Sequence, residues 1–261
     1  MNSGTPPVRI AHAYGNHRQA LRRALDAPID MIEADIWYRA GEIWVRHERR
    51  LKWLPLLADR RSTAAHSAGP LTLRLWKGYY IRPDIRPLKL ADLLDTVAGR
   101  KRLLLDVKGS GDRESAAFGA VLARRISQHN AGEWAVVCGQ FWPVLHRLRE
   151  RSPRLEVRYS IEKPHQWRRF RHMLEAGDGA RKVCMEHRFL VPERARFLED
   201  NGIDVYCWTV DDPAAAERLV AQGVDGIISN DLSLLGSLGK RRSSGRRGVA
   251  RADDPKRRGR S

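Results

Sequence analysis

The sequence predicts an α/β fold, and within that class a (β/α)8 TIM barrel. Eight short apolar runs alternate with amphipathic helical patterns along the chain. Strands that alternate with helices pair in parallel through crossover connections. The length of 261 residues suits a barrel of roughly 250 residues. The alternative is an open, doubly wound sheet, but the first strand lacks the Gly-x-Gly-x-x-Gly turn of a dinucleotide site.

The predicted strands are apolar runs of four to six residues, most of them flanked by polar or turn-forming residues. In chain order they are 8–12, 31–36, 103–107, 135–138, 155–160, 182–186, 205–209 and 226–229. The helical patterns between them are 16–25, 90–97, 115–126, 143–150, 166–175, 192–201 and 213–222. Several of these patterns begin with proline, which is favoured in the first turn of a helix.

One stretch interrupts the alternation. Residues 42–47 form an extra short predicted strand, and residues 48–86 are then long, basic and without a clear period. The stretch follows strand 2, at the barrel face where active-site loops lie. Because it also contains Trp53, Trp76 and Tyr79, we expect an inserted loop that covers the barrel mouth as a lid or binding element.

The positive charge of the chain is concentrated at its C-terminal end. Residues 240–261 hold ten Lys/Arg and two Asp, so they carry +8 of the net +17. We expect a barrel domain over 1–239 and a disordered basic tail over 240–261. Such a tail can contact an anionic membrane surface or nucleic acid, although a purely solubilising tail fits the sequence equally well.

Several classes of protein are excluded by composition. No window approaches the ~18 consecutive apolar residues of a membrane span, and the N-terminus lacks the basic and apolar regions of an export signal. The three cysteines are odd in number and far apart, which argues against a disulfide framework or a zinc site. These features predict a cytoplasmic protein.

Acidic residues at predicted strand ends suggest a cation site. Glu33 and Asp35 are two residues apart on one strand, so both face the same side. Asp106 follows three leucines at the end of the next strand and can join them. Three carboxylates form a hard-oxygen set that suits Mg²⁺ or Ca²⁺. Lys108, two residues after Asp106, would face the same way and supply positive charge to a phosphate. The alternatives are a salt-bridged or solvated Glu33–Asp35 pair at a strand end, and an ordinary ion pair between Asp106 and Lys108.

Two histidines also lie at predicted strand ends. His12 ends strand 1, and His47 ends the extra strand over 42–47. Imidazole exchanges protons near neutral pH, so either ring is a candidate acid or base beside the carboxylates. A lone histidine is more often structural, so these two are catalytic candidates only as members of the ordered set that includes the carboxylates and Lys108.

The order His12, Glu33-x-Asp35, His47, Asp106-x-Lys108 resembles the glycerophosphodiester phosphodiesterase family, within the wider phosphatidylinositol-phosphodiesterase-like barrel superfamily. Further motifs extend the resemblance over roughly residues 8–235. They are the proline–leucine helix at 87–94, Tyr206-Cys-Trp-Thr-Val at 206–210, and Gly-Val-Asp-Gly-Ile-Ile-Ser-Asn-Asp at 223–231.

The sequence departs from the family pattern at three positions. Ala13 follows the first histidine where the family has a phosphate-binding arginine, Glu48 follows the second histidine in place of Asp, and Asp106 replaces a Glu. The candidates to replace the missing guanidinium are Arg46, Arg49, Arg50 and Lys108.

The resemblance implies a metal-dependent hydrolase that releases glycerol phosphate and an alcohol from glycerophosphodiesters. It implies one Mg²⁺ or Ca²⁺ on Glu33, Asp35 and Asp106, and acid–base catalysis by His12 and His47. It places Asn16, Lys108 and Trp208 against the substrate, with equal weight for Trp208 as a core residue. Two alternatives stay open: a phospholipase-D-like enzyme acting on lysophospholipids or sphingolipids, and a barrel that has lost catalysis and binds anionic ligands.

Overall fold

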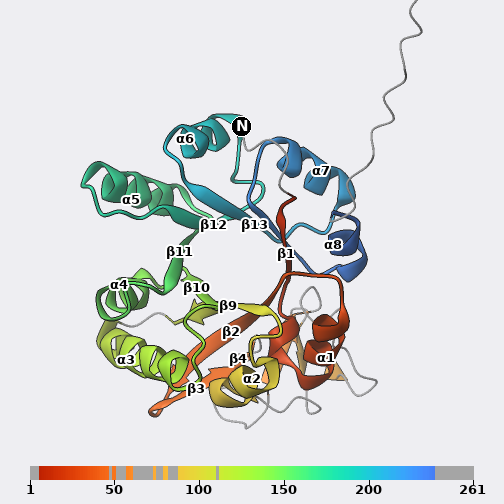
Figure 1. Cartoon of the computed structure of the whole chain (residues 1–261), viewed down its shortest axis with the longest axis vertical. Helices are drawn as coiled ribbons and strands as arrows, with labels where there is room; N and C mark the ends of the chain where they lie inside the picture. Colours follow the sequence, from red (N-terminus) through yellow and green to blue (C-terminus); the bar gives the residue numbers. More distant parts are fainter. Residues whose placement is uncertain are drawn as a thin grey trace, which may run out of the picture.

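The structure, a computed structural model, describes residues 6–46, 49–50, 57–60, 73–74, 79–81, 88–109 and 112–238. It confirms the predicted barrel: eight parallel strands form a closed ring surrounded by helices (Figure 1). The strands are β1 (Val8–Ala11), β2 (Met31–Arg39), β9 (Arg102–Lys108), β10 (Ala135–Gly139), β11 (Glu156–Ile161), β12 (Lys182–Glu186), β13 (Asp204–Trp208) and β14 (Gly226–Ser229). Each overlaps a strand predicted from the sequence.

The ring closes through β1, which pairs in parallel with both β14 and β2. The order around the barrel is β1, β14, β13, β12, β11, β10, β9, β2. Because all eight strands are parallel, their carboxyl ends meet at one face, and polar residues at those ends come together there.

Helices follow the strands around the outside. They are α1 (Arg18–Asp26), α2 (Leu90–Val97), α3 (Asp112–Gln128), α4 (Trp142–Arg151), α5 (Pro164–Glu175), α6 (Pro192–Asp200), α7 (Pro213–Ala221) and α8 (Leu232–Leu238), with the short 3-10 helix η1 (Tyr14–Asn16) before α1. Helix α8 is not among the predicted helices, because its seven residues include Gly236 and show no clear helical period.

The strand β2 extends beyond the barrel and supports the insertion. Its second half pairs antiparallel with β3 (Glu42–Val45), and β3 pairs with β8 (Leu88–Lys89). Between β3 and β8, the described backbone forms a second antiparallel sheet from β4 (Arg49–Arg50), β5 (Leu57–Arg60), β6 (Leu73–Arg74) and β7 (Tyr79–Ile81). The stretch expected to be a loop therefore contains paired strands, which are too short to give a readable period. That it covers the barrel mouth stays a prediction.

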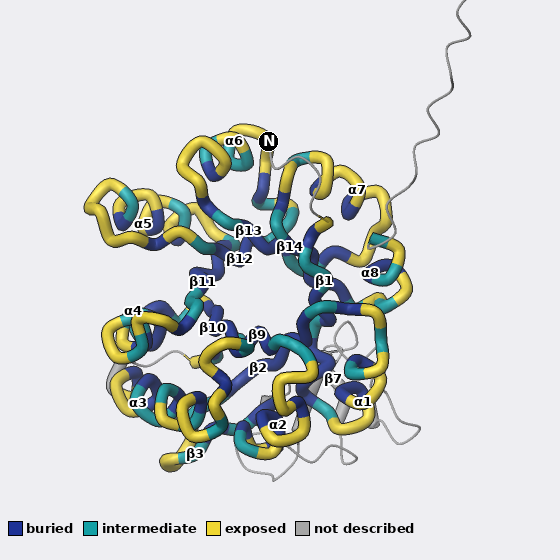
Figure 2. The backbone as a smooth tube through the Cα atoms, viewed as in Figure 1, coloured by how far each residue is buried: buried dark blue, intermediate teal, exposed yellow. Residues whose placement is uncertain are grey.

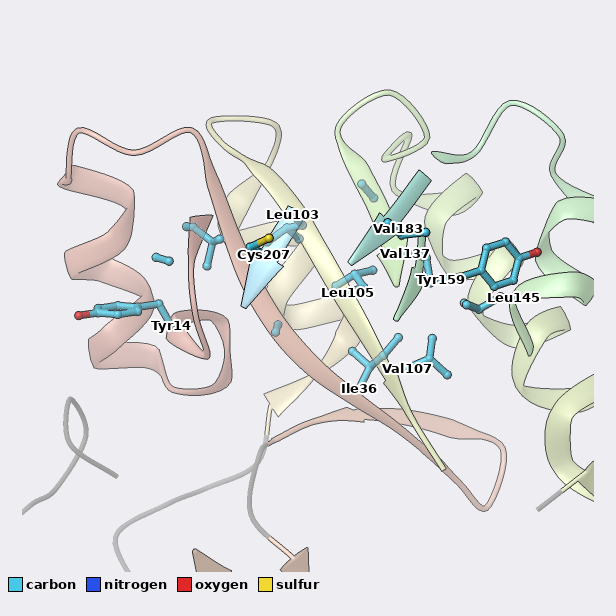
Figure 3. Packing of buried hydrophobic residues seen from close by; sticks show 14 of the residues in the cluster. Tyr14, Ile36, Leu103, Leu105, Val107, Val137, Leu145, Tyr159, Val183 and Cys207 are labelled. Atoms are coloured by element: carbon cyan, nitrogen blue, oxygen red, sulfur yellow. The ribbon is translucent and has the colours of Figure 1, made fainter. Parts of the chain in front are cut away.

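Alternation along the strands produces two apolar layers. One set of side chains faces the helices and forms the main core. Figure 2 shows the barrel strands mostly buried, while the surrounding helices carry exposed residues on their outer faces. Figure 3 shows part of this layer, with Leu103, Leu105 and Val107 along β9. The other set, which includes Ile10, Met31 and Leu104, fills the barrel interior.

An arginine is buried inside the barrel. Arg158 of β11 is 1% exposed, and its Nε donates to Glu156 at 2.8 Å while Nη2 donates to Asp204 at 3.1 Å. Its guanidinium lies 3.3 Å from the ring centroid of Tyr206. Gly226 leaves space for that ring, since a Cβ there would lie 2.5 Å from Tyr206 Cδ1.

The three cysteines, Cys138, Cys184 and Cys207, are buried and carry free thiols. Among the residues that the structure describes, no helix combines the length and the apolar character that a membrane span requires.

Candidate functional site

The loop after β1 holds the first predicted site residue against β2. Ala13 adopts a left-handed conformation with φ of 60°, which directs its backbone N–H toward Glu33 Oε2 at 2.5 Å. Gly15 allows the loop to approach β2 closely, because a Cβ at that position would lie 2.6 Å from the Ala34 Cβ. The loop therefore brings His12 and Glu33 to the same end of the barrel.

The three predicted carboxylates come together at the carboxyl ends of β2 and β9. Glu33, Asp35 and Asp106 each offer a carboxylate oxygen, and these oxygens lie within 4.8 Å of one another. Asp35 and Asp106 are register partners on neighbouring strands. Glu33 and Asp35 are 3% and 0% exposed, so water does not screen their charges effectively.

The electrostatics of this cluster favour a cation. Burial, reinforced by the charges of Asp35 and Asp106, raises the pKa of Glu33 well above its usual range. Lys108 supplies one internal positive charge, with Nζ 2.8 Å from Asp35 Oδ1 and in contact with Asp106. Burial alone would lower the pKa of Lys108, but the neighbouring carboxylates outweigh it and hold the pKa well above its usual value.

The donor set fits a hard divalent ion. Three carboxylates carry more negative charge than one lysine neutralises, and carboxylate oxygens are the ligands that Mg²⁺ and Ca²⁺ prefer. The predicted grouping of Glu33, Asp35 and Asp106 is thus present, and its geometry is one that could hold a divalent cation.

His12 lies beside the cluster. Its ring is oriented by Asn230, which is itself held by Asp211. Its Nε2 is 3.9 Å from Glu33 Oε2, and its Nδ1 is 2.9 Å from Asn230 Oδ1. The Asn230 amide is fixed in turn, because its Nδ2 donates to Asp211 Oδ2 at 2.7 Å and its backbone N–H donates to Asp211 Oδ1 at 2.8 Å. Ser229 Oγ also donates to Asp211, at 2.9 Å.

These contacts determine which ring nitrogen of His12 carries the proton. A carboxylate only accepts hydrogen bonds, so the Asn230 amide must direct Nδ2 at Asp211 and Oδ1 at His12. A carbonyl oxygen also only accepts, so Nδ1 of His12 is the protonated nitrogen. In the neutral ring, Nε2 is then the unprotonated nitrogen on the side of Glu33.

Asp211 keeps its charge in this position. Burial would raise its pKa, but the hydrogen bonds from Asn230 and Ser229, with a smaller effect of His12, lower it below the usual value. The series His12, Asn230 and Asp211 thus ends in an ionised carboxylate.

Asn16 lies behind the cluster. It is 0% exposed, its Nδ2 donates to Asp35 Oδ2 at 2.7 Å, and its Oδ1 accepts from the Asp35 backbone N–H at 2.9 Å. Both ends of the amide orient Asp35, and a contact between Asn16 and a substrate stays a prediction.

Trp208 ends β13 and is partly buried against the apolar residues of the barrel interior. Arg46, one candidate for the missing guanidinium, follows β3, and its guanidinium lies 5.1 Å from the Trp37 ring. The substrate contacts predicted for Trp208 and Lys108 are not tested by these positions.

His47 and Glu48 lie outside the described residues, as do the side chains of Arg49 and Arg50. The catalytic assignment of His47 therefore stays a prediction.

The sequence analysis missed the roles of Asn230 and Asp211. Asp212, the neighbour of Asp211, has a different role, as the N-cap of α7, and accepts from the Ala215 N–H at 3.0 Å. A signal for Asn230 was available, since it follows the last strand and its side chain therefore belongs to the same barrel face as His12.

Comparison with known sequences gives two matches. The sequence model of the Glycerophosphoryl diester phosphodiesterase family matches residues 111–234. Glycerophosphodiester phosphodiesterase GDPD4 of Arabidopsis thaliana is 24% identical over 251 residues, which cover 89% of this chain and 73% of the relative. The family match begins after Asp106, so the acidic cluster and His12 precede it.

Solved structures support the barrel independently. A crystal structure of a putative glycerophosphoryl diester phosphodiesterase from Silicibacter pomeroyi has a TM-score of 0.69 at 19% identity, covering 90% of this chain and 94% of that one. A phosphodiesterase from Oleispira antarctica, solved in complex with the product sn-glycerol-3-phosphate, has a TM-score of 0.65 at 15% identity, covering 89% and 96%. At these identities the likeness establishes the fold.

Proposed function

We propose that this chain, which matches the glycerophosphodiester phosphodiesterase family model over residues 111–234 and a relative of that name at 24% identity, is a metal-dependent hydrolase of glycerophosphodiesters that releases glycerol phosphate and an alcohol. The observation that carries the proposal is the convergence of Glu33, Asp35 and Asp106 beside His12 at the carboxyl ends of the barrel strands. The product named for the Oleispira antarctica relative supports the same class of substrate.

Glu33, Asp35 and Asp106 would hold one Mg²⁺ or Ca²⁺. A phosphodiester resists hydrolysis because its negative charge repels nucleophiles, and a divalent ion would neutralise that charge. Lys108, which contacts Asp35 and Asp106, adds a positive charge for the phosphate oxygens. Asn16 keeps Asp35 oriented through its two hydrogen bonds.

His12 acts as the general base. With Nδ1 donating to Asn230, Nε2 accepts a proton from the attacking hydroxyl, which belongs either to water or to the substrate itself. The second proton transfer, to the leaving alkoxide, falls to His47 on the strength of the family resemblance.

A turnover assay tests this function. The substrates are glycerophosphocholine, glycerophosphoethanolamine and lysophosphatidylcholine, each measured with Mg²⁺, with Ca²⁺ and with EDTA. We expect release of glycerol phosphate from at least one glycerophosphodiester, and loss of turnover in EDTA. Asp35→Asn is the matched variant, because it keeps the shape of the side chain and removes its charge.

The outcomes separate the alternatives. Turnover of the lysolipid alone would replace the proposal with a phospholipase-D-like activity. Turnover that persists in EDTA and in Asp35→Asn would contradict metal dependence. Absence of turnover on all three substrates with either cation would favour a barrel that only binds anionic ligands.

A further inference from the structure

A cleft lies at the end of the barrel opposite the acidic cluster. It is bounded by the C-terminal part of α4, by the start of β11 and by the turn between α5 and β12, and its volume is about 780 Å³. Small-molecule sites typically have volumes of roughly 300–1,000 Å³. The cleft opens at the amino ends of β11 and β12, whereas Glu33, Asp35 and Asp106 lie toward the carboxyl ends of their strands.

The chain around this cleft is locally basic. Residues 142–182 contain eleven Lys/Arg and five Asp/Glu, whereas residues 183–238 contain four Lys/Arg and ten Asp/Glu. The positive charge therefore belongs to the α4–α5 side of the barrel and is not spread evenly over it. The lining itself holds four Lys/Arg and three Asp/Glu, so its attraction for an anion depends on which of these charges are already paired.

The carboxylates of the cleft are already engaged. Asp178 is bound to Arg149, and Glu150 pairs with Arg147 at 3.2 Å. Glu156 accepts from Lys182 Nζ at 2.9 Å, besides its bond to Arg158 within the barrel. The negative charges lining the cleft are thus neutralised by the protein itself.

Two arginines of the lining, in contrast to these carboxylates, have no ion-pair partner among the described residues. They are Arg154 and Arg181, and both are exposed. Arg181 uses Nη1 for the Asn201 carbonyl oxygen at 2.9 Å. Guanidinium groups bind phosphate through paired, charge-assisted hydrogen bonds, and here they come from both sides of the cleft, before β11 and before β12.

Apart from Arg149 and Lys182, which are ion-paired, the other lining residues are apolar or neutral. Leu155, Val157 and Ala180 contribute to the wall, and Tyr159 presents a hydroxyl that accepts from Arg149 Nη1 at 3.0 Å. His146 lies 3.3 Å from the same hydroxyl through Nδ1. The lining therefore combines an apolar surface with two available guanidinium groups.

We propose that this cleft binds a small ligand that carries a phosphate group and an apolar body, with Arg154 and Arg181 on the phosphate and Leu155 and Val157 against the apolar part. The site is separate from the acidic cluster, and the inference does not depend on the proposed hydrolase function.

The test uses 1-naphthyl phosphate, a phosphate monoester with an apolar ring, titrated into the full-length protein in EDTA by calorimetry. The cleft variant is Arg154→Ala/Arg181→Ala. The matched control is Arg168→Ala/Arg171→Ala, which removes the same charge from exposed positions of α5 outside the cleft. We expect at least tenfold weaker binding in the cleft variant and less than a twofold change in the control.

A second readout reports on the cleft itself. The ring resonances of His146 should shift on titration, and 1-naphthol and inorganic pyrophosphate should each bind more weakly than the ester that combines both parts. Equal weakening in the two arginine variants would overturn the proposal, since it would indicate attraction to net charge alone. Binding that is lost in Lys108→Gln but kept in the cleft variant would also overturn it, by assigning the ligand to the acidic cluster.

Vesicles identify the source of the phosphate. Binding to vesicles of phosphatidylcholine with phosphatidic acid, but not of phosphatidylcholine alone, and dependent on Arg154 and Arg181, supports a lipid head group as the ligand. Binding of the soluble ester without vesicle binding supports a free phosphate ester.

Discussion

His12 depends on two residues that do not touch the acidic cluster. Asn230 accepts from Nδ1 of the ring, and Asp211 fixes the amide that does so. Because a histidine base needs one unprotonated nitrogen facing the reaction, the partner of the other nitrogen controls its function. Asn230 directly follows β14 and Asp211 lies in the loop after β13, so residues from three separate segments set the state of one ring.

Removing this support should lower turnover without lowering cation affinity. We expect Asn230→Ala and Asp211→Asn to reduce kcat by roughly 10–100-fold, as is typical when a supporting hydrogen bond to a site residue is lost. The measurement is kcat beside the cation Kd for each variant, with Asp35→Asn as the variant that loses both.

An exchange of the two residues gives the control. Asn230→Asp/Asp211→Asn keeps an acceptor next to His12 and a donor behind it, so its turnover should exceed that of Asp211→Asn alone. Wild-type kcat in Asn230→Ala would show that the amide does not position the histidine.

At the scale of elements, the packing of β14 against β13 depends on a glycine. Gly226 at the start of β14 faces the Tyr206 ring of β13, which in turn covers the buried Arg158. A methyl group has no room there, because its carbon would lie 2.5 Å from Tyr206 Cδ1.

We therefore expect Gly226→Ala to destabilise the barrel by about 1–3 kcal/mol, the usual cost of adding a methyl group to a packed interior. Gly236→Ala in α8 is the control, since its Cβ would approach Pro28 Cγ only to 3.5 Å, and alanine is favoured over glycine in helices. Urea unfolding of the three proteins measures the difference. Equal stability of Gly226→Ala and the wild type would mean that Tyr206 moves aside without cost.

A carboxylate next to the same two strands has an unusual pKa. Asp225, just before β14, accepts from the Val205 N–H at 2.8 Å. Burial and the proximity of Asp204 raise its pKa to about 6. Its neutral form is thus favoured in the folded state, so its contribution to stability is full below pH 3.8, the ordinary pKa of the group, and is lost as the pH rises through about 6.

Asp225→Asn should make this contribution independent of pH. We expect the Tm of the variant minus that of the wild type to increase between pH 4 and pH 7.5, because only the wild-type side chain ionises over that range. Asp26→Asn, at an exposed position in α1, changes the same formal charge and serves as the control. The hypothesis fails if the two substitutions give the same dependence on pH.

For the whole molecule, the barrel closes before the basic tail begins. The last described helix, α8, ends at Leu238, and β1 pairs with β14 to complete the ring. We expect a chain ending at Gly239 to fold with the Tm and turnover of the full chain, because the strands and core lie within residues 8–238. Thermal melts and the turnover assay compare the two chains, and a clear fall in Tm would show that the tail packs on the barrel.

Much of the fold could be predicted from residue order alone. Seven of the helices follow amphipathic patterns, because each turns one apolar face to the core, and the eight barrel strands follow short apolar runs, because both of their faces are buried. The grouping of Glu33, Asp35 and Asp106 also followed from the sequence, since parallel strands bring their carboxyl ends to one face and a spacing of two keeps side chains on one side.

Other features were decided only by the tertiary structure. His12 is supported by Asn230 and Asp211, and Asn16 orients Asp35. Arg158 is buried against Tyr206. All of these contacts join residues from 19 to more than 200 positions apart in the sequence. Such contacts produce no repeating pattern in the sequence, because each depends on two particular residues that meet only in the folded chain. The order of the strands and the closure of the barrel determine which of these residues come into contact, whereas the sequence determines only which side chains the chain carries.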